Sequence, residues 1–360
     1  MKETIDFIKT NPGTNILSGL TIAVEILKNE KIKKSNESRV SSVILLSDGI
    51  DMYHNDIQLA NALKNMTKGQ DLSFTLHTFG YGNKYDAKIM IKLAALRDGS
   101  FYYVKDYNKV SEYFACVLGG CISVISQKSE LNVKLLKNEC KIVKVFGLEN
   151  LYQWELKDDI FKTTMLQFMF GKEYSFALEI KVDENNIKIG EDLLDINLEY
   201  KKINQDNILN INFKYKYELK SIDYAKANEE YIRCQVYSVL DEVVILKEKG
   251  KIIEAKELLN KMKEFLKNKY KGDDKNLLAN IEKSYDLFKN DNKLADKSFK
   301  FLSSEIRQNL YKKEGSSSNK YNNSMQNYLM NSIKLPIPAR SMAIDLNKKF
   351  DFNKINCDKK

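Results

Sequence analysis

The chain has 360 residues, 43% of them hydrophobic and 30% charged, a balance typical of a globular protein with room for about two or three domains. Its 58 basic and 49 acidic residues give a formal net charge of +9, but both signs are spread along the whole length, so we expect no nucleic-acid-binding surface. No stretch approaches the roughly 18 apolar residues of a membrane-spanning helix, and the amino-terminal sequence lacks a signal-peptide pattern, which excludes a transmembrane protein.

Cysteine and histidine usage argues against a structural zinc site. The only histidines are His54 and His77, and no Cys-x-x-Cys spacing occurs. The cysteines do not pair evenly; they are Cys116, Cys121, Cys140, Cys234 and Cys357. This usage is typical of a reducing compartment, so we expect a cytoplasmic protein.

Residues 1–126 alternate helical and strand signals. The run "VILLS" is apolar throughout, as is typical of a strand covered on both faces. Three strands are predicted, at residues 43–47, 74–82 and 100–104. Helical patterns precede, separate and follow them, the last around "VSEYFACVLGGCISVIS". Strands and helices that alternate in this way predict right-handed crossovers and a parallel α/β sheet.

Residues 130–220 predict an antiparallel β-sandwich of about six or seven strands. The clearest strand, "ILNINFKYKYEL", alternates strictly between apolar and polar residues. Its apolar members are expected on one buried face; they are Leu209, Ile211, Phe213, Tyr215 and Tyr217.

From residue 222 to 315 the apolar period is that of a helix, with Gly250 at a turn between two stripes. Such stripes are more typical of a helical bundle or hairpin core than of a cofactor cavity. Residues 316–360 begin with the polar run "SSSNKYNNSMQN", which predicts a low-complexity linker and tail.

Four short motifs occur in a fixed order: "GTNI" opening a helix, then "VILLSDG", "HTFGYG" and "AALRDGSFYYV". In this order they resemble the von Willebrand factor type A domain, in the intracellular variety that continues into a β-sandwich. The resemblance covers residues 1–126 and extends loosely over the sandwich and the helices. It implies a Rossmann-like α/β domain with a binding site at the carboxyl ends of the parallel strands.

The resemblance also implies a divalent cation, Mg²⁺ or Mn²⁺, as cofactor. In the family the ligands are a D-x-S-x-S motif on the first strand, a threonine on a later loop and an aspartate after the fourth strand, and a partner's carboxylate completes the shell. The matching positions here are Thr14 and Asp48. Hard cations prefer such oxygen ligands. The alternative interpretation makes Thr14 a neighbour of a helix N-cap and Asp48 a turn former before Gly49.

The D-x-S-x-S strand itself is not found. The run "DLSFT" looks similar, but Asp71, Ser73 and Thr75 precede or open their strand, which places them at the pole opposite Asp48; we interpret them as a loop entering a strand. We therefore expect the chain to begin midway through the domain, the "VILLS" strand to lie at a sheet edge, and metal binding to be weak or absent.

The resulting hypothesis is a non-enzymatic scaffold that binds protein partners, in one version through an acidic partner side chain on the metal. The layout also resembles that of proteins that choose targets for ubiquitin ligases carrying a RING or U-box; this chain lacks the cysteine and histidine pairs of a RING, so the resemblance implies substrate selection only. One alternative is a metal-independent structural subunit. Another is a nucleotide-handling enzyme, against which no Gly-rich phosphate loop follows any strand and His77 lies mid-strand, where we expect it packed. Partner identity and oligomeric state stay open.

Overall fold

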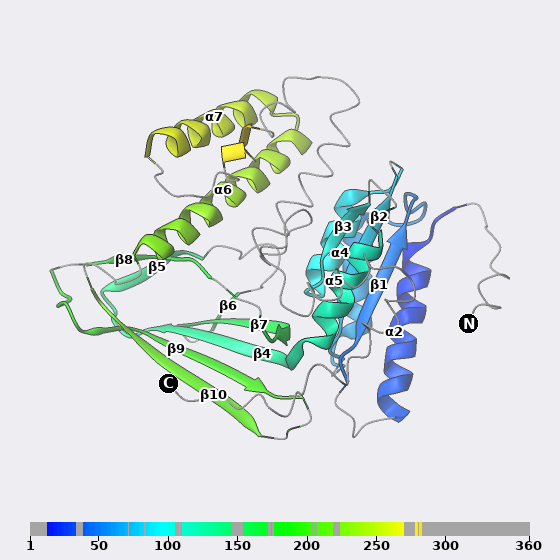
Figure 1. The fold of residues 1–360 in the computed structure, drawn as a ribbon, viewed down its shortest axis with the longest axis horizontal. Helices are drawn as coiled ribbons and strands as arrows, with labels where there is room; N and C mark the ends of the chain where they lie inside the picture. Colours follow the sequence, from blue (N-terminus) through cyan, green and yellow to red (C-terminus); the bar gives the residue numbers. More distant parts are fainter. Residues whose placement is uncertain are drawn as a thin grey trace, which may run out of the picture.

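The computed structural model describes residues 13–33, 39–70, 72–82, 84–104, 108, 110–145, 154–157, 159–171, 174, 176–183, 185–203, 205, 207–218, 224–269, 278–279 and 281–282. The predicted linker and tail at 316–360 and the helical pattern beyond residue 282 lie outside these residues, as does Asp71. The described elements form an α/β unit, an antiparallel β region and a helical hairpin (Figure 1).

The α/β unit is built on a parallel sheet in the order β1-β2-β3, as the sequence predicts. Its strands are β1 (Ser42–Ser47), β2 (Thr75–Tyr81) and β3 (Phe101–Val104). The helices are α2 (Ile16–Lys33), α3 (Asp56–Thr67), α4 (Ala87–Leu96) and α5 (Val110–Ile122). Helices α2, α3 and α4 share one apolar core with the sheet, whereas α5 packs on aromatic residues of β2 and β3. The sheet is therefore covered on both faces at β2.

Strand β1 is the edge of this sheet among the strands that the structure describes. Its residue Leu46 is 48% exposed, whereas Leu76 on β2 is fully buried. The prediction of a strand covered on both faces is confirmed in part for β1: Val43 and Leu45 pack against the core on one face and Ile44 against the cluster on the other, whereas Leu46 stays exposed. The expectation that this strand lies at a sheet edge is confirmed for the described residues.

Among the described residues, seven strands follow in the antiparallel region, within the predicted number. They are β4 (Val124–Leu135), β5 (Cys140–Val145), β6 (Glu155–Lys157), β7 (Ile160–Met169), β8 (Leu178–Val182), β9 (Asp192–Lys201) and β10 (Ile208–Lys216). Five form a sheet in the order β10-β9-β4-β7-β6, and β5 pairs with β8 in a second sheet. Residues of both sheets share one apolar core around Trp154, Met165 and Leu194.

Two details of this region differ from the sequence prediction. Helix α5 ends at Ile122 and β4 begins at Val124, whereas the apolar run predicts a helix to residue 126. The chain turns at Ser123, whose amide donates to the Gly119 and Gly120 carbonyls. Apolar periodicity cannot locate the end of the helix, because the residues of this run are apolar at the spacing of a helix and also at that of a strand.

Strand β10 does not bury the face that its alternation predicts. Ile211 is 54% exposed and Phe213 is 58% exposed, whereas Tyr215, nearer the second sheet, packs against the core. The strand is the outermost of the five-stranded sheet, and the β5–β8 sheet covers only part of that face. An alternating pattern indicates which side chains share a face, not that a second layer covers them.

The helical region forms a hairpin of α6 (Tyr224–Glu248) and α7 (Ile252–Lys269), which confirms the predicted turn at Gly250. Gly250 has φ +75° and donates its amide to the Lys247 carbonyl, a left-handed helix end that favours glycine. Leu240 and Leu259 are fully buried between the helices. Within the described residues, no helix has both the length and the apolar character needed to cross a membrane.

Candidate functional site

The candidate site lies at the carboxyl end of β1, where the loop of residues 48–55 meets the start of α2. The Met52 amide donates to the Thr14 carbonyl across 3.1 Å, which fixes the two segments side by side. A Cβ built on Gly49 would lie only 2.4 Å from Thr14 Oγ1. The hydroxyl of Thr14 is therefore in contact with Gly49, the residue that follows Asp48. The two sequence-predicted residues lie at the same pole of the sheet.

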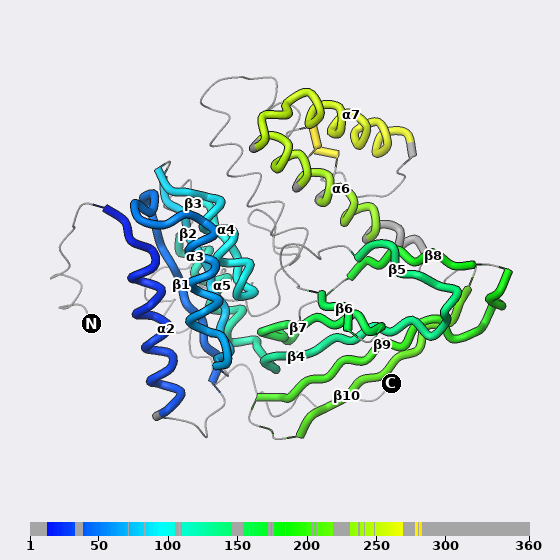
Figure 2. Tube along the Cα trace, turned by 180° about the vertical axis from the view of Figure 1, so that it is seen from behind, coloured from blue at the N-terminus to red at the C-terminus, as the bar shows by residue number. Residues whose placement is uncertain are grey.

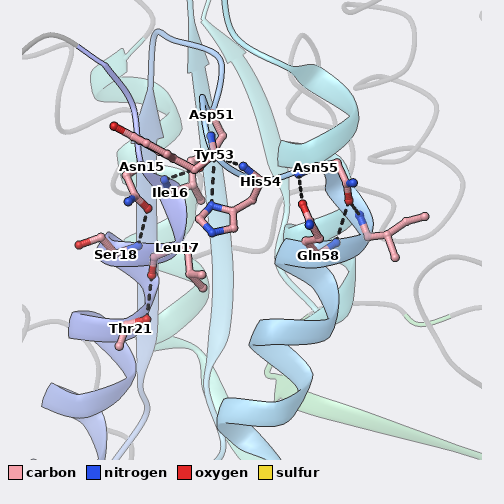
Figure 3. Close-up of polar contacts among 11 residues, drawn as sticks. Asn15, Ile16, Leu17, Ser18, Thr21, Asp51, Tyr53, His54, Asn55 and Gln58 are labelled. Atoms are coloured by element: carbon pink, nitrogen blue, oxygen red, sulfur yellow. Dashed lines mark hydrogen bonds and ion pairs between the residues drawn. The ribbon is translucent and has the colours of Figure 1, made fainter.

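Asp51 holds this junction together, and sequence reasoning missed it (Figure 3). Its carboxylate is buried; Oδ2 accepts the Ile16 amide at 2.6 Å, and Oδ1 accepts the amides of Tyr53 at 2.8 Å and His54 at 2.7 Å. The His54 ring Nδ1 lies 3.3 Å from the same Oδ1. One side chain thus ties the first turn of α2 to its own loop. Because Oδ1 accepts the amides of Tyr53 and His54 and Oδ2 accepts the amide of Ile16 within a buried junction, we assign Asp51 as a positioning residue.

The charge state of Asp51 follows from these contacts. Burial raises the pKa of its carboxyl, but the hydrogen bonds from the amides of Tyr53, Ile16 and His54 and from the His54 ring outweigh burial and hold the pKa below its ordinary value. The group is therefore ionised at neutral pH. A carboxylate at the amino end of α2 also complements the partial positive charge of the helix dipole.

Asp48 is solvent-exposed, and Thr14 is half-buried. Asn15 is the residue that caps α2, since its Oδ1 accepts the Ser18 amide at 2.9 Å. Ser47 Oγ donates to the Gly49 carbonyl at 3.0 Å, which braces the bend that carries Asp48. The alternative interpretation thus describes the backbone well: Thr14 is the neighbour of an N-cap and Asp48 stands in a turn. Neither role uses the Asp48 carboxylate itself.

The donors present suit a hard cation in kind but not in number. A hydroxyl and a carboxylate are oxygen ligands, which Mg²⁺ prefers, yet they fill only about two of its six positions. In the described part of the chain, no group of three or more His, Cys, Asp or Glu side chains could hold a metal ion. Thr14 and Asp48 therefore suit a hard cation in kind, but by themselves they would fill only part of its coordination shell.

Several large apolar side chains close in sequence to Asp48 are exposed. They belong to the loop after β1 and to the first turn of α3, and each is at least 58% exposed: Ile50, Met52, Tyr53 and Ile57. We call these four residues the apolar rim. The sequence gives no hint of it, because apolar residues are ordinarily expected to be buried. Exposed apolar side chains that gather on one face are a mark of protein contact surfaces.

Of the "DLSFT" residues, Ser73 and Thr75 are described, and both lie away from this site. Ser73 lies just before β2 and donates to the Leu166 carbonyl of β7 at 3.5 Å, and Thr75 Oγ1 lies 2.6 Å from Ser42 Oγ at the start of β1. Both stand at the amino end of the parallel sheet, as predicted. His77 is buried, and its Nδ1 accepts the Ser100 amide at 3.2 Å. The prediction that His77 is a packed residue is confirmed.

No family model matches the chain. Among solved structures, a von Willebrand factor type A protein from Catenulispora acidiphila superposes with a TM-score of 0.60 at 14% identity, over 86% of this chain and 73% of that one. The ArnB paralog VWA2 from Sulfolobus acidocaldarius gives a TM-score of 0.45 at 17% identity, over 84% and 70% of the two chains.

An uncharacterized protein of Synechocystis, sll0103, is 30% identical over 112 residues, which are 31% of this chain and 25% of that protein. The chain thus spans about a quarter of the length of this curated relative. The superposition on the Catenulispora protein shows the fold: this chain has a von Willebrand factor type A-like α/β unit with a parallel sheet, followed by a separate antiparallel sheet.

The contact between Thr14 and Gly49 can be tested by a double-mutant cycle. We expect Gly49→Ala to destabilise the chain by about 1–3 kcal/mol, because its Cβ would overlap Thr14 Oγ1. In a Thr14→Ala background the same change should cost less than about 1 kcal/mol, since the clashing oxygen is gone. Chemical denaturation followed by circular dichroism measures both. Equal costs in the two backgrounds would place the hydroxyl elsewhere.

Proposed function

We propose that the chain is a non-enzymatic protein-interaction module that binds its partner at the carboxyl end of the parallel sheet. The observation that carries this proposal is the contact of the Thr14 hydroxyl with Gly49, the residue that follows the exposed Asp48. The apolar rim adds desolvatable surface around these polar groups, a mixture that suits a protein contact. The type A-like fold supports the same assignment.

A divalent cation, Mg²⁺ or Mn²⁺, has a defined place in this proposal. Thr14 and Asp48 would hold it, and an acidic side chain of the partner would complete its shell. One carboxylate and one neutral hydroxyl leave the cation electron-poor, so it favours an external carboxylate. In this scheme the metal and the partner bind together, and neither binds tightly alone.

This scheme makes a prediction for the isolated chain. Titration with Mg²⁺ or Mn²⁺, followed by calorimetry, should give no site tighter than roughly millimolar, since two ligands leave most of the shell to water. The Asp48→Ala variant, which removes one of the two donors, should give the same trace. A micromolar site that is lost in Asp48→Ala would show that the chain completes the shell by itself.

A capture experiment separates the metal-bridged module from a metal-independent structural subunit. Partners retained by the intact chain are compared with and without EDTA, and against the Asp48→Ala variant. Loss of capture both in EDTA and in the Asp48→Ala variant supports the cation bridge. Capture that is insensitive to EDTA but lost in a Met52→Ser/Tyr53→Ser variant would mean that the partner binds at this end of the sheet without a metal ion. Capture unaffected by any of these changes favours the structural subunit.

Two further hypotheses follow from the sequence. Substrate selection for a ubiquitin ligase is one form that the partner-binding role would take, and it follows only from the resemblance to proteins of this layout. A nucleotide-handling enzyme is the other alternative. An ATPase activity that co-purifies with the chain and is lost in a single point variant would favour it over the interaction module.

A further inference from the structure

The outer strand of the antiparallel sheet offers an interaction surface far along the chain from the candidate site. Strand β10 pairs with β9 and, among the strands that the structure describes, with no other. Figures 1 and 2 show it along the edge of the sheet that faces away from α6 and α7. Ile211 and Phe213 are more than half exposed on one face of this strand.

Natural edge strands usually carry features that prevent pairing with another chain. Such features are short length, proline, bulges and charged side chains. Strand β10 is nine residues long, contains no proline, and pairs regularly with β9 up to an irregularity at Tyr215 and Lys216. Its two charges, Lys214 and Lys216, lie in its last third. Within the described residues, this edge is therefore suited to strand addition over most of its length.

We propose that β10 pairs antiparallel with β10 of a second copy of this chain, about a twofold axis through Asn212. A twofold axis perpendicular to the sheet must bring residues of the same face opposite each other, so that the apolar faces of both copies lie on the same side. This holds only when the axis passes between the two copies of one residue. Asn212 is the middle residue of Ile208–Lys216, so this register alone pairs all nine positions.

The side chains brought together in this register are complementary. On the apolar face, Ile211 stands opposite Phe213 of the second copy, and Leu209 stands opposite Tyr215. Each apolar pair continues a row on β9, where Leu198 pairs with Ile211 and Ile196 with Phe213. Cross-strand aromatic and β-branched pairs of this kind stabilise sheets.

The polar face also accepts this register. Lys214 stands opposite Asn210 of the second copy, and Lys216 opposite Ile208, so no like charges meet directly. A twofold axis through Lys214 would instead place that lysine opposite itself, which is unfavourable. The charge pattern of β10 thus favours the register that also pairs the whole strand. The two five-stranded sheets would form one ten-stranded sheet.

The oligomeric state of the intact chain tests this inference. Sedimentation velocity over a dilution series should show a dimer that dissociates on dilution. The double variant Ile211→Lys/Phe213→Lys should be monomeric throughout, because it sets lysines opposite each other, and its far-ultraviolet circular dichroism should match the wild type since both sites are exposed. The control Leu46→Lys, on the β1 edge, should dimerise like the wild type. A monomeric wild type, or a dimer lost in Leu46→Lys but kept in the β10 variant, would overturn the proposal.

A cysteine pair tests the register itself. With the axis through Asn212, the two copies of residue 212 face each other with Cα atoms about 4.5–5.5 Å apart, within disulfide range. Mild oxidation of Asn212→Cys should therefore yield more covalent dimer than the same treatment of the unaltered chain, whose own cysteines set the background. The control Asn210→Cys should not cross-link, since its two copies would lie about 13 Å apart along the strands. Equal cross-linking of both variants, or of neither, would refute this register.

Discussion

Replacing Asp51 with alanine should destabilise the α/β unit by about 2–4 kcal/mol, because three backbone amides and the His54 ring lose a buried acceptor. A buried donor left without an acceptor costs more than the net value of an exposed hydrogen bond. The loss should appear as a lower denaturation midpoint in circular dichroism. Thr14 should also lose its fixed position, since Asp51 links the amide of Ile16 to the loop.

The matched control for this variant is Asn55→Ala. Asn55 caps α3 in the same way, accepting the Ile57 amide at 3.0 Å and the Gln58 amide at 2.9 Å, but it is exposed. Water can replace an exposed cap, so its loss should cost only about 1 kcal/mol. If both variants lose the same stability, the burial of Asp51 does not strengthen its hydrogen bonds, and its role as the brace of the site fails.

Asp51 should also contribute to the acid sensitivity of the fold. Its pKa is lower in the folded chain than in the unfolded one, so the carboxylate stabilises the fold fully above the ordinary aspartate pKa, and this contribution is lost as pH falls through the lowered value. Asp56, whose pKa is lowered chiefly by Lys92 and Lys88 against the effect of burial, acts with the same sign. The stability difference between the wild type and Asp51→Asn should therefore shrink on acidification. A difference that stays constant down to strongly acidic pH would contradict this assignment.

The parallel sheet could be predicted because its signals are local. Each strand is a short apolar run between helical segments, and the handedness of the crossovers fixes the topology. The exposure of Phe213 could not be predicted in the same way. It depends on which strand becomes the outer one and on how far the β5–β8 sheet extends, and both follow from packing between segments distant in sequence.

The candidate site divides in a similar manner. Thr14 and Asp48 follow from the order of motifs, since strand ends and helix starts meet at one pole of an α/β sheet. Asp51 lies only three residues after Asp48, yet its role depends on its acceptance of the Ile16 amide from 35 residues away. No periodicity reveals such a bond. The rim residue Met52 was missed for a related reason, because the exposure of an apolar loop residue is a property of the assembled fold.

Gly99 should tolerate no side chain, and Gly99→Ala is expected to cost about 3 kcal/mol or more, up to a failure to fold. It lies in the motif "AALRDGSFYYV", between α4 and β3. A Cβ there would stand 1.7 Å from the Leu76 carbonyl oxygen and 2.3 Å from its carbon. These are backbone atoms of β2, held in register by the pairing of Leu76 with Val43, so they cannot move aside as a flexible side chain would.

The matched substitution Gly19→Ala should have the opposite sign. Gly19 lies within α2, and a Cβ there would meet no atom within 4 Å. Alanine in a helix interior is favoured over glycine by about 1 kcal/mol, so this variant should raise the denaturation midpoint. Neither glycine has a left-handed backbone, so alanine is compatible with the backbone conformation at both positions. The difference in stability between the two variants therefore reports the close packing around Gly99. A Gly99→Ala variant as stable as the wild type would mean that α4 and β3 do not meet β2 at this turn, and the order of the parallel sheet would have to be revised.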